Sequence, residues 1–253
     1  MLAGLSKAIS LYLAPLLALA AVFLSLFAYL APAGLLHTTA LLNVRSTPGG
    51  QNASSSTAMF VYLGTLGSCV KPDQESPIQC TKLSSTPNYD LRLLPASSPK
   101  LILSAPTRGT PETLAIGISF SILFFISFTL ISFRHKLPAG GRLGEILDKP
   151  VFQRISAWLG IAGFLLGIAS SLVLRLWFGK SASDFNQTVA LQAVDFQPLL
   201  VASLGNVFTL MYVGYAFYAV PVVISLSKMN LPTKPQVQVA LPEPQAVPAQ
   251  DEP

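Results

Sequence analysis

Charged residues are scarce in this chain, and their absence from long stretches excludes an ordinary soluble domain. Asp, Glu, Lys and Arg make up 11% of the 253 residues, whereas a soluble domain usually carries about 25%. A charge at the centre of a bilayer costs about 2.5–3.5 kcal/mol on insertion scales. The charges avoid four apolar stretches and gather between them, so the pattern indicates an integral membrane protein. No basic run is interleaved with aromatics, and we expect no nucleic-acid partner.

Histidine is equally rare, and the usual catalytic motifs are missing. His37 and His135 are the only two histidines, and the topology predicted below puts them on opposite sides of the membrane. The sequence has no phosphate-cradling glycine loop, no H-E-x-x-H and no G-x-S-x-G. We therefore expect no enzyme, no catalytic residues, no cofactor and no metal site.

Four uncharged stretches are each long enough to cross a bilayer as a helix. About 20 residues at 1.5 Å per residue cover a hydrocarbon core of about 30 Å. Helices are expected because lipid cannot satisfy open backbone groups. The first stretch has an apolar core of about 20 residues, longer than the roughly 7–15 of a cleaved signal peptide, so we interpret it as a span. The predicted spans are residues 8–31, 113–133, 155–174 and 196–226.

The distribution of positive charge predicts the orientation of these spans. The connection 134–154 carries five Lys/Arg in 21 residues, whereas the loop 32–112 carries six in 81. Dense positive charge in a short connection marks the cytosolic side. Both termini, residues 1–7 and the Pro-rich tail 227–253, are then cytosolic, and the tail should be disordered.

Two N-x-[ST] sequons agree with this orientation. They begin at Asn52 and Asn186, which fall in the predicted outer loops 32–112 and 175–195. Glycosylation takes place on the side away from the cytosol. The chain is therefore expected to be a glycoprotein, with glycans at these two asparagines.

The large outer loop contains the only two cysteines, Cys69 and Cys80. In an oxidising compartment, two cysteines in one loop favour a disulfide. Closing about a dozen residues would contribute roughly 3 kcal/mol. A metal-binding pair and a reactive thiol are the alternatives. No histidine stands near the cysteines in the sequence, and two thiolates are too few for a zinc site, so we favour the structural disulfide.

Short β-like segments surround the cysteines. Residues 58–63 are apolar, aromatic and β-branched, residues 41–44 and 78–81 could pair beside them, and residues 71–77 form a polar turn. We predict a small antiparallel sheet whose neighbouring strands are joined by the disulfide. The expected fold class is thus a four-helix transmembrane bundle with a small disulfide-stapled extracellular antiparallel β-sheet.

One short motif in this loop resembles a known family. It is Gly64-Thr65-Leu66-Gly67-Ser68-Cys69, followed after ten residues by Cys80. The segment resembles the fungal version of the claudin-superfamily signature, which occurs in the mating-associated tetraspan family that regulates calcium influx and membrane fusion. Chain length, span number and loop sizes are also similar, and the resemblance covers about residues 8–228.

The resemblance implies a claudin-like plasma-membrane protein that acts at cell–cell contact during mating. It implies partners among membrane lipids and other membrane proteins, or a second copy of the chain across a contact. The eisosome-associated and PalI-type tetraspans are similar as well. They imply the alternative role of a cortical organiser or a subunit of a pH-sensing complex.

The third predicted span has small residues at four-residue spacing. Gly163, Gly167 and Ser171 follow this spacing, and Gly160 lies on the same side. Small residues on one helix face allow close approach of another helix in a membrane. Packing within the bundle is favoured, and a dimer face is the alternative.

Overall fold

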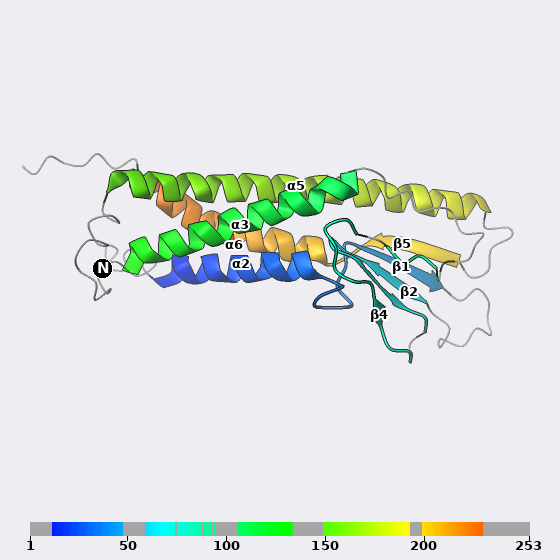
Figure 1. Ribbon diagram of the computed structural model, residues 1–253. Helices are drawn as coiled ribbons and strands as arrows, with labels where there is room; N and C mark the ends of the chain where they lie inside the picture. Colours follow the sequence, from blue (N-terminus) through cyan, green and yellow to red (C-terminus); the bar gives the residue numbers. More distant parts are fainter. Residues whose placement is uncertain are drawn as a thin grey trace, which may run out of the picture.

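The computed structural model describes residues 12–47, 59–73, 75–87, 89–92, 94, 106–133, 149–192 and 199–229. An elongated bundle of helices carries an antiparallel sheet at one end (Figure 1). The helices are α2 (Ala14–Leu30), α3 (Pro106–Phe133), α5 (Pro150–Gln192) and α6 (Val207–Met229). The strands are β1 (Leu42–Thr47), β2 (Phe60–Leu63), β3 (Ser68–Lys71), β4 (Gln79–Cys80) and β5 (Leu199–Leu204).

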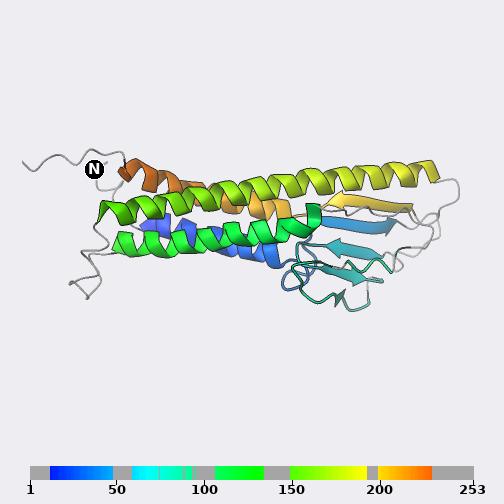
Figure 2. The same ribbon diagram turned by 45° about the horizontal axis from the view of Figure 1, so that its top comes forward.

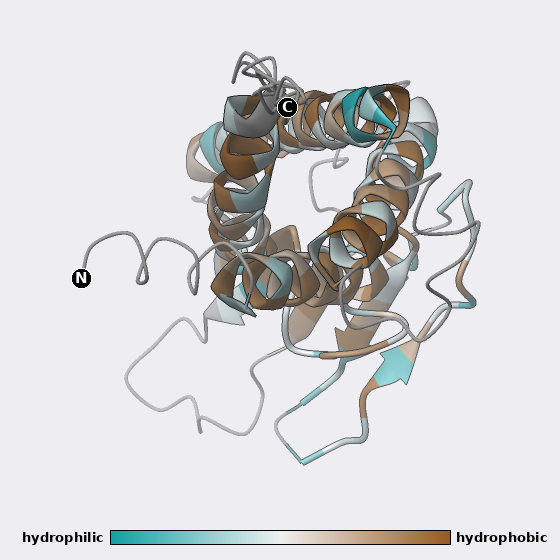
Figure 3. Ribbon diagram, turned by 90° about the vertical axis from the view of Figure 1, so that its left-hand side faces the viewer, coloured by the Kyte–Doolittle hydropathy of each residue, from teal (hydrophilic) through white to brown (hydrophobic). Residues whose placement is uncertain are grey.

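Three of these helices are long and apolar enough to cross a membrane. The apolar segments are Gly109–Phe133, Pro150–Leu191 and Val207–Ser227. Helix α2 is also apolar, but its 17 residues extend only about 26 Å, and residues 8–11 of the first predicted span lie outside the described residues. Figure 3 looks along the bundle from the end opposite the sheet, and apolar residues cover most of the four helices.

Helix α5 does not end where the sequence predicted. A loop was expected from residue 175, but the helix continues to Gln192 and reaches 43 residues, or about 64 Å. Its last third lies over the sheet (Figures 1 and 2). Phe178, Ala182, Phe185 and Val189 recur at helical spacing and are buried in the same core as the strand residues. This amphipathic stripe explains why the predicted loop 175–195 is helical over most of its length.

The start of the fourth predicted span is also corrected. Residues 196–226 were expected to form one helix, but Leu199–Leu204 is a strand and the helix begins at Val207. A short apolar run fits a buried strand as well as a helix. Pairing decides the outcome here, because β5 aligns antiparallel with all six residues of β1, from Leu42↔Leu204 to Thr47↔Leu199.

The predicted antiparallel sheet is confirmed and is larger than expected. Its strand order is β4-β3-β2-β1-β5, and every pairing is antiparallel. Val61 and Leu63 of β2 are fully buried while Phe60 and Tyr62 are half-buried, which is the alternation of a strand with one face on a core. That core continues into the bundle through Ala28, Leu114 and Met211.

The small residues of α5 lie inside the bundle. A side chain at Gly160 would meet the ring of Phe124 on α3, and one at Gly163 would meet Ser121 of α3 and Tyr218 of α6. Gly167 lies against Gly117 of α3 and Tyr215 of α6, and the Ser171 hydroxyl donates to the Gly167 carbonyl. This is the arrangement of packing within the bundle, because both neighbours of the stripe belong to the same chain.

Asn186 of α5 caps the outer edge of the sheet. Its Nδ2 donates to the Ala202 carbonyl and its Oδ1 accepts from the Ala202 N–H, each at 2.8 Å. Ala202 belongs to β5, which is an edge strand of the sheet formed by the described residues. One side chain thus satisfies backbone groups that an edge would otherwise expose. Glycosylation of Asn186 stays a prediction, and Asn52 lies outside the described residues.

Replacing Asn186 by alanine is expected to lower the free energy of unfolding by about 2 kcal/mol, because two hydrogen bonds of a partly buried edge are lost. The midpoint of thermal unfolding should fall by roughly 4–8 °C for a chain of this size. Thr188→Ala is the matched control, since it also removes the sequon but leaves both bonds of Asn186 in place. Equal midpoints for the two variants would contradict the capping role.

Candidate functional site

The glycine–cysteine motif forms the hairpin between β2 and β3. Leu63↔Ser68 is the last residue pair before the turn, and four residues connect the two strands. The Gly64 N–H donates to the Gly67 carbonyl at 2.9 Å across this connection. The two glycines of the motif are therefore the first and last residues of one tight turn.

Gly64 lets the hairpin lie against the end of α2, and Gly67 lets it lie against Thr81. A Cβ at Gly64 would overlap the Ala31 carbonyl and the Pro32 ring, and a Cβ at Gly67 would lie 2.6 Å from Oγ1 of Thr81. Backbone and ring atoms cannot move aside as the end of a flexible side chain can. Glycine is thus required where the sheet meets the bundle.

The predicted disulfide is confirmed. Cys69 and Cys80 are bonded with S–S 2.05 Å and Cα–Cα 4.0 Å, and they face each other in the register of β3 and β4. Cys69 is fully buried whereas Cys80 is exposed. Thr81 adds a second connection between the strands, because its Oγ1 accepts from the Ser68 N–H at 2.9 Å and donates to the Ser68 carbonyl at 3.2 Å.

A histidine that sequence reasoning placed far from the cysteines lies beside them. Nδ1 of His37 is 3.6 Å from Sγ of Cys80 and 2.8 Å from the Pro32 carbonyl. The nitrogen and the two sulfurs all lie within 4.8 Å of one another. His37 is 43 residues from Cys80, and only the short segment between α2 and β1 brings it there. No spacing rule could have identified this contact.

Tyr89 connects the segment 89–92 to the glycine–cysteine motif by a hydrogen bond. Its hydroxyl donates to the Gly64 carbonyl at 3.0 Å, and burial raises the pKa of Tyr89 above the usual value of a tyrosine. The neighbouring Asp90 N–H donates to the Ser68 hydroxyl at 2.8 Å. Both bonds hold this segment across the hairpin.

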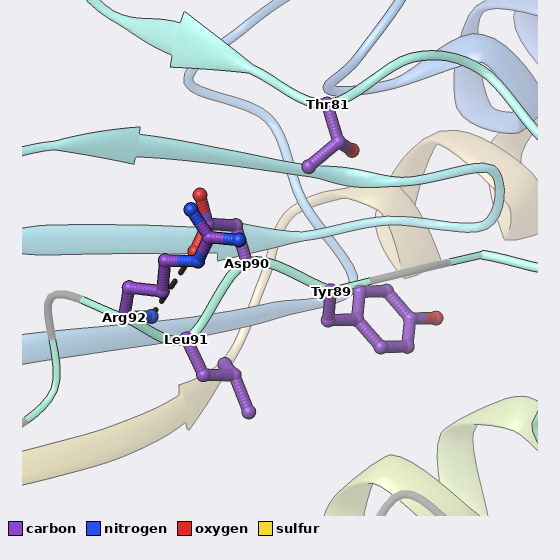
Figure 4. A pocket seen from close by; sticks show the side chains of 5 residues that line it. All are labelled: Thr81, Tyr89, Asp90, Leu91 and Arg92. Carbon is purple, nitrogen blue, oxygen red and sulfur yellow. Dashed lines mark hydrogen bonds between the residues drawn. The ribbon is translucent and has the colours of Figure 1, made fainter. Parts of the chain in front are cut away.

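A shallow pocket of about 290 Å³ opens next to Tyr89. Thr81, Asp90, Leu91 and Arg92 complete its lining, and the Arg92 N–H donates to the Asp90 carboxylate at 3.1 Å (Figure 4). The pocket therefore offers one carboxylate and one guanidinium group beside an apolar side chain. Polar and apolar groups contribute about equally to the lining of this open pocket.

Tyr89→Phe is expected to lower the free energy of unfolding by about 1 kcal/mol at pH 7, because one hydrogen bond is lost. The raised pKa gives a second signature. The folded state disfavours ionisation of Tyr89, so the wild-type protein should lose stability as the pH rises above the ordinary tyrosine pKa near 10.

The phenylalanine variant should lose less stability over the same alkaline range. Chemical unfolding at pH 7 and above pH 10 would measure both effects. Identical slopes of stability against pH in the two proteins would contradict the assignment to Tyr89.

The polar turn predicted between the cysteines is organised by Asp73. Its carboxylate accepts the N–H groups of Glu75 and Ser76 and the Ser76 hydroxyl. Hydrogen bonds from Ser76 lower the pKa of Asp73. The oxygens of this carboxylate are engaged in the turn, which is typical of an Asx-turn.

The geometry defines one candidate site: the hairpin glycines Gly64 and Gly67, the Cys69–Cys80 disulfide and the neighbouring His37. Sequence reasoning identified the first four residues but not the histidine. The second histidine of the chain, His135, lies outside the described residues. No family model matches the chain, and a search of curated proteins finds no match.

Proposed function

We propose that the chain is a four-span plasma-membrane protein of claudin-like type, with its sheet outside the cytosol and both termini inside. Three apolar helices long enough to cross a membrane support this. Helix α2 packs in the same bundle against α3 and α6, and it exposes Leu16, Phe23 and Phe27. Large apolar side chains on the outer surface of a bundle are suited to lipid.

Labelling of single introduced cysteines tests this topology. Ser85 lies at the sheet end and Ser227 near the end of α6, and both are exposed. An impermeant maleimide should label Ser85→Cys in intact cells, and should label Ser227→Cys only after permeabilisation. The reverse pattern, or labelling of both in intact cells, would overturn the proposed orientation.

The proposed role is non-enzymatic: regulation of calcium influx and membrane fusion at cell–cell contact during mating, through membrane proteins or lipids. The observation that carries it is the motif of Gly64, Gly67, Cys69 and Cys80. Gly64, Gly67 and Cys69 belong to the β2–β3 hairpin next to the end of α2, and the disulfide joins this hairpin to Cys80 on β4, so the motif corresponds to one connected structural unit beyond the helices. Such a unit is suited to contact with another surface.

Deletion of the gene in its native host tests this role. Mating cells that lack the protein should show reduced fusion and altered calcium uptake, and wild-type protein should restore both. A fluorescent fusion should accumulate at sites of cell contact. Unchanged cell fusion and calcium uptake in the deletion strain would count against this role. Fluorescently tagged protein in static cortical patches of vegetative cells would then favour the cortical or pH-sensing role instead.

A further inference from the structure

A hydrogen-bond donor, His37, lies beside the disulfide between Cys69 and Cys80. The three residues belong to separate segments of the chain. Cys69 lies on the buried strand β3, Cys80 on the exposed strand β4, and His37 between α2 and β1. The two residues therefore differ in exposure: Cys80 is an exposed residue, whereas Cys69 is fully buried.

The hydrogen bond to Pro32 determines which nitrogen of His37 carries hydrogen. A carbonyl oxygen only accepts hydrogen bonds, so Nδ1, at 2.8 Å from the Pro32 oxygen, is the donor. The same nitrogen is 3.6 Å from Sγ of Cys80. The Pro32 carbonyl thus holds a hydrogen-bond donor beside this sulfur.

We propose that the Cys69–Cys80 pair is a thiol–disulfide exchange site that reacts with small thiols, such as glutathione, through Cys80. A thiolate of the small molecule attacks Sγ of Cys80 and forms a mixed disulfide. The S–S bond to Cys69 breaks, and Cys69 leaves with the electron pair as a thiolate.

A second small thiolate then attacks the sulfur of the small molecule in the mixed disulfide. Cys80 leaves as a thiolate and the small-molecule disulfide is released. Two thiols supply the two electrons, and the reverse sequence oxidises the dithiol again.

His37 stabilises the thiolate form of Cys80. A donor beside a sulfur stabilises the thiolate, which is the leaving group in the second step and the nucleophile in the reverse reaction. A metal site is less well supported by this geometry. The nitrogen nearest the sulfur already donates to Pro32, and a metal ligand needs a nitrogen free of hydrogen.

The test uses the purified full-length chain in lipid nanodiscs with glutathione. Reaction is stopped by alkylation, and mass spectrometry of peptides locates the adduct. We expect folded protein to form the glutathione adduct at Cys80. Adduct at Cys69, or reaction only at the rate of unfolding, would overturn the proposal.

Variants of His37 test its contribution separately. His37→Asn keeps an N–H near the position of Nδ1, whereas His37→Ala removes it. Release of Cys80 from the mixed disulfide should be roughly three- to tenfold slower in the alanine variant and intermediate in the asparagine variant. Equal rates in all three proteins would overturn the role of His37. Stoichiometric Zn²⁺ that protects both thiols of reduced wild type, but not of His37→Ala, would assign a metal site and overturn exchange.

Discussion

Gly64→Ala is expected to lower the free energy of unfolding by about 3 kcal/mol or more. The added Cβ would overlap the Ala31 carbonyl and the Pro32 ring, and overpacking against atoms that cannot rotate away lies at the upper end of small-to-large substitutions. The midpoint of thermal unfolding in detergent or nanodiscs should fall by roughly 6–12 °C. Part of the population should fail to reach the folded state.

Gly109→Ala is the matched control for this variant. Gly109 lies in the first turns of α3 and no heavy atom stands within 4 Å of a Cβ built there. The same chemical change should leave stability unchanged or raise it slightly, since alanine favours a helix over glycine. Equal thermal midpoints for Gly64→Ala and Gly109→Ala would contradict the close approach of the hairpin to α2.

A second glycine fixes the sheet to the bundle from the other side. Gly205 connects β5 to α6, its N–H donates to the Leu41 carbonyl at 2.9 Å, and a Cβ there would overlap the Ala40 carbonyl. Gly64 and Gly205 thus directly follow β2 and β5, the two strands that flank β1. The position of the sheet over the helices depends on two backbone contacts that only glycine permits.

Charge distribution located the four helices along the chain, because charges are costly inside a segment that crosses a bilayer, and three of these helices are long and apolar enough to do so. It could not predict where α5 ends. The stripe of Phe178, Ala182, Phe185 and Val189 is helical in period, but its partner is a sheet assembled from distant segments. Polar residues between these positions, such as Lys180 and Asp184, look like those of a loop when only charge is considered.

The strand β5 was missed for a related reason. Leu199–Leu204 is a short apolar run that is closely followed by a helix long and apolar enough to cross a membrane, and composition alone extends the helix over it. Its strand conformation results from pairing with β1, more than 150 residues earlier in the chain. Sequence reasoning works from local windows, and no local window contains both partners.

The candidate site was likewise predicted from the sequence only in part. The glycines and cysteines were identified because all four lie within a segment of 17 residues, where a sequence motif can be recognised. His37 was excluded because it is distant in sequence from both cysteines. The segment between α2 and β1 returns it to Cys80, and the only local signal was a histidine in an otherwise apolar and uncharged stretch.

Removing the disulfide with the double variant Cys69→Ala/Cys80→Ala is expected to lower the free energy of unfolding by about 3 kcal/mol, because the bond closes a short loop in the unfolded chain. The cysteines are 11 residues apart. We expect the variant to remain folded, since the pairing of β1 with β2 and β5 does not depend on this bond. Thermal unfolding would show a midpoint roughly 6–12 °C below that of wild type.

Reductant provides the control for this prediction. Wild-type protein treated with dithiothreitol should unfold near the midpoint of the double variant, whereas the variant itself should not respond. A wild-type midpoint that reductant leaves unchanged, with both thiols shown to be free, would contradict a stabilising role. Because β4 has only two residues and is an edge strand of the described sheet, paired with β3, the loss of structure in the reduced protein should begin at this edge, which is also where the exposed residue Cys80 lies.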